Sequence, residues 1–398
     1  MRAAAWILFL MPAAGAWAGE PWPQFRGPNG DGISPETGIN KDWKTKPPKV
    51  LWRRPMGDNG YSQPIIADGK AFILDYSGGQ DVVVALELET GKEAWKFPYA
   101  SKSNSTQGYT RSTPAFSDGK LYTLSKMGLA HCLDARNGTK VWALDFKDFG
   151  GVLPGWGYGM SPLVDGDWVI LVPGGNANAV VAVEKATGKP VWKSGPAAKA
   201  GYATPVIADI GGKKQYLVFM QNSLIGVEAA NGKLLWSHPW ATDWDVNAAA
   251  PIAAPGGVFI TSGYKTGCAL VDVSGAKPRE KWRNKEIQSH FNSAILHGGM
   301  LYSTTDPGRL VCLDPATGTV KWEHKGFEKG GLCAIDGALI VVDGANGAVV
   351  QVALEPNGYR ELGRIAAPLG GKSWTAPVAG AGKLLIRNLK ELAALDLK

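Results

Sequence analysis

The stretches CLDARNGTKVW (residues 132–142) and CLDPATGTVKW (residues 312–322) are nearly the same eleven residues, written twice in one chain of 398 residues. Cysteine, leucine, aspartate, glycine, threonine and tryptophan recur in register between them. Chance does not explain such a match over six residue types, whereas a structural repeat does. The other copies in the chain decide what kind of repeat it is.

Aligning the chain on the final tryptophan reveals these other copies. Further copies end at Trp95, Trp192 and Trp236, a copy with two extra residues ends at Trp282, and a last copy keeps the glycine but ends at Leu362. The six intervals between Trp52 and Trp322 average 45 residues. Each interval holds alternating apolar runs separated by D-G, N-G or T-G turns, which are typical of antiparallel hairpins. Four short strands in about 45 residues indicate one blade of a β-propeller.

The two ends of the chain predict how the ring closes. The chain ends on ALDLK, the beginning of a repeat whose tryptophan is missing, and KVLW near residue 52 supplies a tryptophan with no repeat before it. We therefore expect an all-β protein with eight four-stranded antiparallel blades, in which the N-terminal strand completes the last blade and removes a free sheet edge. One large ring in each blade is expected to pack between neighbouring sheets. These structural tryptophans are Trp52, Trp95, Trp142, Trp192, Trp236, Trp282 and Trp322.

The first residues are typical of a secretory signal peptide. Arg2 is followed by an apolar run and by Ala16-Trp17-Ala18, an A-x-A cleavage pattern. We therefore expect a signal peptide over residues 1–18, an N-terminal extension over 19–48 and one propeller over 49–398. No cysteine follows the signal, so we expect a periplasmic or secreted protein without a lipid anchor, and no later run is apolar enough to span a membrane.

Cysteine and charge narrow the function classes. The four cysteines lie at 132, 268, 312 and 333, with no adjacent pair, no C-x-x-C and no C-x-x-C-H haem motif. The formal net charge is +7, without a dense run of Lys and Arg. We read this as a basic, solvated surface and expect no nucleic-acid partner and a monomeric protein.

The repeat pattern A-x-D/E-x-x-T/N-G-x-x-x-W resembles the PQQ-like (quinoprotein) propeller repeat. The stretches WPQFRGPNGDG (22–32), YGMSPLVDGDWVILVPGG (158–175) and FITSGYKTGCALV (259–271) are similar to the secreted, PQQ-binding-like branch. The resemblance covers essentially the whole mature chain. It implies the fold, whereas this fold hosts both dehydrogenases and inert scaffolds.

Three functions remain open after this resemblance. A dehydrogenase dependent on PQQ (pyrroloquinoline quinone) and calcium would need an acidic calcium cage, and its large alcohol-oxidising members carry adjacent cysteines; neither pattern is present here. A non-catalytic scaffold, similar to the outer-membrane assembly lipoprotein of this fold, fits the short loops. A secreted carbohydrate-binding propeller is the third. We favour a non-catalytic binding module without cofactor or metal, whose partner is a small molecule, a glycan or an envelope protein.

The segments that lead into the inner strands carry the candidate site. Inner strands converge on a propeller's central channel, and the repeat does not demand the diverse side chains found there, which begin at Tyr61 in the first blade. Asp245 and His290 lie in adjacent blades, which allows an acid–imidazole pair between them, and such a contact would raise the pKa of the histidine. The predicted ligand-binding residues are Arg111, Tyr158, Tyr202, Asp245, Asn247, His290, Asn292 and Trp374.

Overall fold

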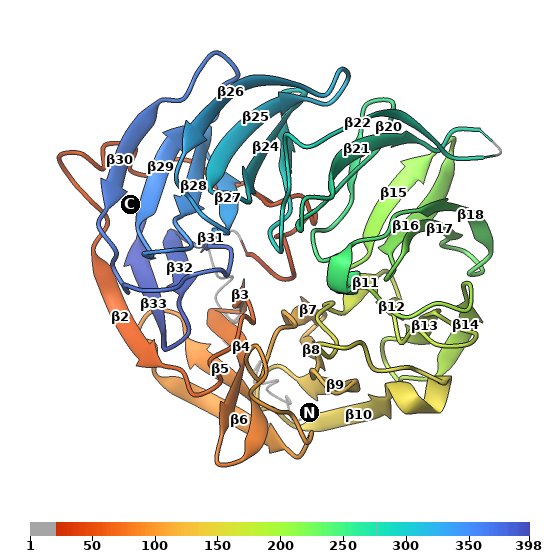
Figure 1. Ribbon diagram of the computed structural model, residues 1–398. Coiled ribbons are helices and arrows are strands. Elements are labelled where there is room, and N and C mark those ends of the chain that lie inside the picture. Colours follow the sequence, from red (N-terminus) through yellow and green to blue (C-terminus); the bar gives the residue numbers. More distant parts are fainter. Residues whose placement is uncertain (1–20, 276) are drawn as a thin grey trace, which may run out of the picture.

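The computed structural model describes residues 21–275 and 277–398, and the predicted signal peptide lies outside these residues. Eight antiparallel sheets stand side by side in a ring around a central channel (Figure 1). This arrangement confirms the predicted eight-bladed propeller. The described residues form no α-helix, and the only helical turns among them are η1 (Phe146–Phe149) and η2 (Asp243–Asp245). No helix of the described chain has the length and hydropathy to cross a bilayer.

Each blade runs along the sequence from the channel to the rim. The first four blades contain β3 (Ile65–Ala67), β4 (Lys70–Ser77), β5 (Gln80–Glu87) and β6 (Glu93–Tyr99); β7 (Ala115–Ser117), β8 (Lys120–Leu124), β9 (Leu129–Asp134) and β10 (Lys140–Asp145); β11 (Leu163–Asp165), β12 (Trp168–Leu171), β13 (Val180–Glu184) and β14 (Pro190–Ser194); β15 (Val206–Ile210), β16 (Lys213–Phe219), β17 (Ser223–Glu228) and β18 (Leu234–Pro239).

The remaining blades follow the same order. They contain β19 (Ile252–Ala254), β20 (Gly257–Ser262), β21 (Gly267–Asp272) and β22 (Arg279–Asn284); β23 (Ile295–His297), β24 (Met300–Thr305), β25 (Arg309–Asp314) and β26 (Thr319–Lys325); β27 (Leu332–Ile335), β28 (Ala338–Val342), β29 (Val349–Ala353) and β30 (Glu361–Ile365); β31 (Val378–Gly380), β32 (Lys383–Arg387), β33 (Glu391–Asp396) and β2 (Val50–Pro55). Since β2 is the outer strand of the eighth blade, the N-terminal strand closes the ring as predicted.

Five blade tryptophans hydrogen-bond to the next blade, namely Trp52, Trp95, Trp142, Trp282 and Trp322, whereas Trp236 bonds to Gln215 of its own blade. The indole N–H of Trp142 in the second blade donates to the carbonyl of Lys185 in the third (3.0 Å), and Trp52 donates in the same way to Leu88 across the closure (2.8 Å). The ring of Trp142 covers Gly188, whose φ is +75° and whose added Cβ would approach the ring to 3.0 Å. Glycine is therefore needed at this turn both for the left-handed backbone and for the close approach of the indole.

A β-bulge next to each tryptophan position directs these side chains. In all eight outer strand pairs the register shifts by one residue at this point. In β10 the extra residue is Val141, which is 44% exposed, while the adjacent Trp142 is 8% exposed. The bulge thus leaves one apolar residue in solvent and turns the large ring toward the neighbouring blade.

A buried ion pair reinforces the closure on the channel side. The Arg387 guanidinium of β32 donates to the Asp58 carboxylate (2.8 Å), and both side chains are 0% exposed. Asp58 also accepts from the hydroxyl of Thr110, so one carboxylate joins the last, first and second blades. All four cysteines are buried free thiols.

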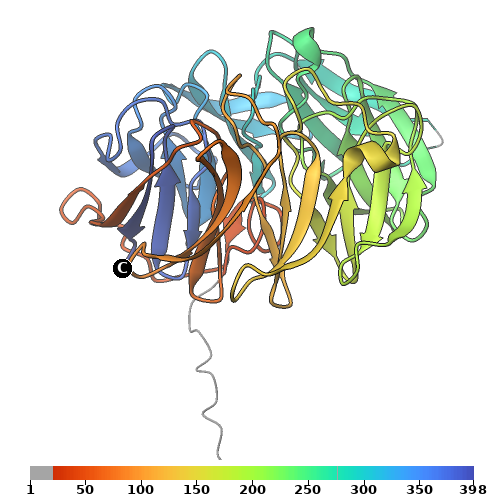
Figure 2. The same cartoon turned by 90° about the horizontal axis from the view of Figure 1, so that it is seen from below.

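The N-terminal extension crosses the end of the channel opposite to η1 and η2 (Figure 2). Trp22 pairs with Ile66 in the first blade, and the carbonyl of Pro23 accepts from Phe116 in the second blade (2.8 Å). Further along, β1 (Ile33–Ser34) pairs in parallel with β27 of the seventh blade. The segment from residue 22 to 34, which we call the N-terminal plug, therefore spans the ring of inner strands.

Candidate functional site

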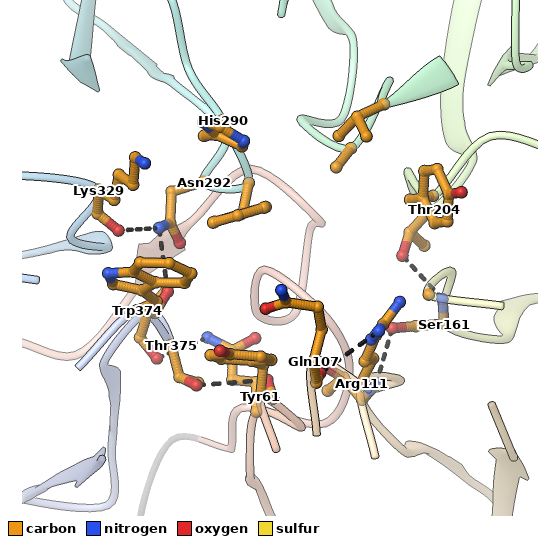
Figure 3. A pocket seen from close by; sticks show the side chains of 18 of the residues that line it. Tyr61, Gln107, Arg111, Ser161, Thr204, His290, Asn292, Lys329, Trp374 and Thr375 are labelled. Atoms are coloured by element: carbon orange, nitrogen blue, oxygen red, sulfur yellow. Dashed lines mark hydrogen bonds between the residues drawn. The ribbon is translucent and has the colours of Figure 1, made fainter. Parts of the chain in front are cut away.

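The central channel holds a cavity of about 370 Å³. Its wall comes from the segments that lead into the inner strands, and its polar side chains surround an open centre (Figure 3). Phe25 of the N-terminal plug is among the lining residues. The cavity is therefore a pocket with the plug at one end, and we call it the channel pocket.

Hydroxyl groups tie neighbouring blades together around the pocket. The backbone N–H of Thr113 donates to the Ser161 hydroxyl (2.9 Å), and the N–H of Ser161 donates to Thr204 (2.9 Å). Farther round, the N–H of Ala250 donates to Ser293 (2.8 Å). In the sequence these hydroxyls belong to the M-S-P and A-T-P segments and to their equivalent at Ser293. They are part of the scaffold that sets the pocket's width.

An aromatic wall occupies one side of the pocket. Tyr61 stacks on Trp374 with ring centroids 5.7 Å apart, and Trp374 contacts Phe291 at 5.1 Å. The arc continues through His290 to Tyr264, each with a 4.4 Å centroid spacing to the ring before it. These rings present flat apolar faces to the cavity in a site that also carries polar groups.

Positive charge lies on opposite sides of the pocket. Arg111 and Lys329 both line it, from the second and the seventh blade (Figure 3). The Lys329 ammonium pairs with the Asp306 carboxylate (3.4 Å). Arg111 donates instead to carbonyl oxygens, those of Trp156 and of Thr106 (3.0 Å to the latter). Burial lowers the pKa of Arg111, which is the response of a cation withdrawn from water.

His290 has a carboxylate partner, but it is not the predicted one. Its Nδ1 lies 3.2 Å from the Asp306 carboxylate, which belongs to the same blade, and the predicted pair with Asp245 does not form. Burial lowers the pKa of His290, while the hydrogen bond that its imidazole donates to Asp306 acts in the opposite direction. The rise in the histidine pKa that a contact with Asp245 would give is therefore not found, and with Asp306 as the partner desolvation outweighs the attraction of the carboxylate.

The structure brings together only some of the predicted site residues. Arg111, Tyr202, His290, Asn292 and Trp374 line the channel pocket. The Asn292 amide also donates to the carbonyls of Lys329 and Trp374, both at 3.1 Å, and so joins two blades at the rim of the cavity.

The other predicted residues lie elsewhere. Tyr158 is 2% exposed and donates to the carbonyl of Pro173 (2.8 Å), so its ring fills the space between blades. Asn247 is fully buried, and its side-chain amide is occupied by hydrogen bonds: its NH2 group donates to backbone carbonyls and its oxygen accepts from the Ser262 hydroxyl. Asp245 is exposed on η2, a short turn where its backbone has a φ of +60°. The expectation that these three face the channel is thus corrected.

Several lining residues were not predicted. Gln107, Trp156, Tyr264 and Lys329 stand on loops between strands, and Phe25 stands on the plug. The repeat alignment could not reveal Gln107, Trp156, Tyr264 and Phe25, because none of these stands just before an inner strand; Lys329 does stand before β27 and could have been found from the register of Asn292. Phe291 could have been found from its neighbours His290 and Asn292.

The donor set does not fit a calcium-bound quinone. No carboxylate is among the described residues that line the channel pocket. Over the described chain, no three His, Cys, Asp or Glu side chains form a group that could hold a metal ion. Calcium requires several oxygen ligands, with carboxylates prominent among them, and the residues around this pocket do not supply such a set.

The ring of eight four-stranded blades and its central pocket define this protein as an eight-bladed propeller of the PQQ-like type. The profile of the family described as outer membrane protein assembly factor BamB matches residues 79–324, more than half of the chain. The chain therefore belongs to this family.

Known proteins similar to this chain include a curated relative and two solved structures. The outer membrane protein assembly factor BamB of Moranella endobia is 26% identical over 306 residues, which cover 70% of this chain and 72% of that protein. The quinohemoprotein alcohol dehydrogenase ADHIIG of Pseudomonas putida has a TM-score of 0.68 at 14% identity, over 95% of this chain and 80% of that one. BamB of Moraxella catarrhalis has a TM-score of 0.62 at 15% identity, over 88% and 98%. At these identities the two structures establish only the shared fold.

Proposed function

We propose that this protein is a non-catalytic binding propeller of the periplasm or extracellular space, whose ligand lies in the channel pocket. The observation that carries the proposal is the pocket itself, in which an aromatic wall and a few polar groups converge above the N-terminal plug. Such a concave, mostly apolar site with convergent polar groups is typical of small-molecule recognition. The protein acts as a monomer in this proposal, since the pocket is complete within one chain.

The similarity to proteins named outer membrane protein assembly factor BamB supports an envelope location and a scaffold without chemistry. The titratable groups near the pocket support the same view. His290 is engaged with Asp306, and Asp306 also contacts Lys329, so the imidazole and the carboxylate are held by each other and by an ammonium. No free carboxylate or imidazole among the described lining residues is placed to act as a general base.

A dehydrogenase dependent on PQQ and calcium is the alternative that the likeness to a quinohemoprotein raises. Titration of the purified protein with PQQ, with and without calcium, tests it. We expect no calcium-dependent complex and no oxidation of alcohols by an artificial electron acceptor. A stoichiometric, calcium-dependent complex that turns over alcohols would replace the proposed function.

A ligand screen tests the binding function itself. Metabolites, glycans and peptides are screened by their effect on the melting temperature of the purified protein, and every hit is retested on a Tyr202→Ala, Trp374→Ala double variant. We expect at least one class to raise the melting temperature of the wild type by several degrees and that of the variant by much less, because bound ligand stabilises the folded state by mass action. Arg136→Gln, an exposed position on the rim, is the matched control and should respond like the wild type. Hits that stabilise the wild type and the Tyr202→Ala, Trp374→Ala double variant equally would place the ligand outside the pocket and contradict the proposal.

A further inference from the structure

Arg111 carries a charge that no carboxylate of the described chain neutralises. The hydrogen bonds of its guanidinium go to the carbonyls of Trp156, Thr106 and Gln107. Lys329 differs, since Asp306 pairs with it. A partly buried cation that lacks a counter-ion favours an anion beside it, and a guanidinium binds a carboxylate particularly well.

Gln63 offers a second and independent sign of the missing ligand. It is 4% exposed, it lines the channel pocket, and its amide N–H donates to the carbonyl of Ala376 (3.1 Å). Its side-chain oxygen, in contrast, is buried without a hydrogen-bond partner among the described residues. A buried acceptor left unpaired costs free energy, and a ligand hydroxyl that reached this oxygen would remove that cost.

The aromatic wall adds a third requirement. The stacked rings of Tyr61 and Trp374 come from the first and eighth blades and line the same pocket as Arg111 of the second blade (Figure 3). A ligand held at Arg111 by its acid group and at Gln63 by a hydroxyl must therefore place a flat, weakly polar face against this wall. A pyranose ring that bears a carboxylate combines all three properties in one small molecule.

We propose that the channel pocket binds a uronate, a sugar acid whose carboxylate is held by Arg111, whose hydroxyls reach Gln63 and whose ring rests on Tyr61 and Trp374. This rests on the proposed binding function and names its ligand class. Since the N-terminal plug contacts the inner strands of the first, second and seventh blades, one end of the channel is obstructed and a polymer cannot thread through it. The uronate is accordingly a free sugar or the terminal residue of an acidic glycan, and not an internal residue.

Isothermal titration of the purified protein tests the ligand class. The probes are glucuronate and galacturonate, their neutral counterparts glucose and galactose, and benzoate as a ring acid without hydroxyls. We expect a uronate to bind about tenfold more tightly than its neutral counterpart, from one charge-assisted hydrogen-bonded pair, and more tightly than benzoate. Trigalacturonate separates the two sources: binding equal to or stronger than that of the monosaccharide indicates the end of a glycan, and weaker binding indicates a free sugar.

Two variants assign the contacts. Arg111→Gln should lose the preference for the acid while keeping the affinity for the neutral sugar, and Gln63→Leu should weaken both. Arg136→Gln is the matched control because this arginine stands in the same blade, 81% exposed by its side chain, and should change nothing. Since Arg111 also holds loop carbonyls, the comparison of acid and neutral sugar on the wild type stands by itself should that variant fold poorly.

The inference is overturned by equal affinities for glucuronate and glucose, by benzoate binding as tightly as the uronates, by an Arg111→Gln variant that keeps the preference, or by no sugar binding at millimolar concentration. Its failure is distinguishable from that of the proposed function. A different compound whose binding depends on Tyr202 and Trp374 leaves the binding function standing and removes only the uronate. A screen in which no compound depends on these residues removes both.

Discussion

The rim of the propeller and the wall of its channel use the same residue types for opposite purposes. At the rim, Trp142 repeats what Trp52 does, with a bulge before it, a glycine of the next blade beneath it and a hydrogen bond to that blade. At the channel, the position of Trp374 is filled by different side chains in the other blades, Tyr61, Arg111 and Tyr202 among them, and Trp374 contacts Tyr61 and Phe291 at the edge of an open cavity. Repetition therefore marks residues that the fold needs, and departure from the repeat marks where a ligand can be selected.

The buried Arg387–Asp58 ion pair at the closure is the clearest exception to this separation of repeated, structural residues from non-repeated, ligand-selecting ones. It lies on the channel side and does not repeat, yet it is structural. Arg387→Met should destabilise the protein by about 3–5 kcal/mol, because the Asp58 carboxylate is left buried without a counter-charge. Urea-induced unfolding measures this loss. The double variant with Asp58→Asn should recover part of it, since no unpaired charge remains, and a single variant as stable as the wild type would refute the structural role.

A rim tryptophan is the next test in order of expected effect. Trp142→Ala should lower the free energy of unfolding by about 3 kcal/mol, because it leaves a cavity between the second and third blades and removes the hydrogen bond to Lys185. The binding of any pocket ligand should remain unchanged in the folded variant. A loss of ligand affinity in this variant would show that the rim and the channel are coupled, and would contradict their separate roles.

Asp81 sharpens the comparison because it is a polar residue buried at the boundary of the first blade, away from both the rim and the pocket. Its side chain is fully buried, one oxygen accepts from Ser103 (3.0 Å) and the other has no partner among the described residues. Burial raises the pKa of Asp81 to about 6. A carboxyl whose pKa is raised by folding contributes stability at a pH below its unfolded value, and that contribution is lost as the pH rises through its folded value.

The stability of the wild type should therefore fall by about 2 kcal/mol as the pH rises from about 4 to about 7, through this group alone. Asp81→Asn keeps the shape and stays neutral, so it should remove that part of the pH dependence. Urea-induced unfolding of both proteins across this range provides the measurement. Parallel stability curves for the two proteins would show that Asp81 is ionised without cost in the fold.

The repeat explains how much could be predicted from the sequence alone. Eight blades, four strands in each and the closure by β2 follow from turn glycines and tryptophans that recur in register, since each unit must bury its faces against its neighbours. The channel position of Arg111, Tyr202 and Trp374 follows from the same register. The direction of a side chain does not: Tyr158 and Asn247 occupy neighbouring positions and turn into the scaffold.

The remainder of the pocket comes from outside the repeat. Phe25 reaches the cavity because the N-terminal plug crosses the ring, and Trp156 and Tyr264 reach it from loops between strands. Such contacts join residues far apart in the sequence through loops whose paths carry no periodic signal. The pairing of His290 with Asp306 was missed for the same reason, because Asp306 lies on a hairpin turn and not before an inner strand.

The smallest expected change in stability gives the sharpest test of the division, because it uses the same substitution as the rim variant. Trp374→Ala should change the free energy of unfolding by about 1 kcal/mol or less, since this half-buried ring stands at an open cavity where solvent can replace it. Its ring contacts Tyr61, Phe291 and the ammonium groups of Lys372 and Lys329 (3.4 and 5.4 Å to the ring centroid), and the loss of these contacts is compensated by hydration of the exposed groups. Ligand affinity should fall at least tenfold in the same variant, because the flat apolar face is gone. Measured by unfolding and by titration, Trp142→Ala should thus lose stability and keep ligand affinity, whereas Trp374→Ala should keep stability and lose ligand affinity. If Trp374→Ala were as destabilising as Trp142→Ala and left binding intact, the channel wall would have the same structural role as the rim. The channel pocket would then not be the ligand-binding site.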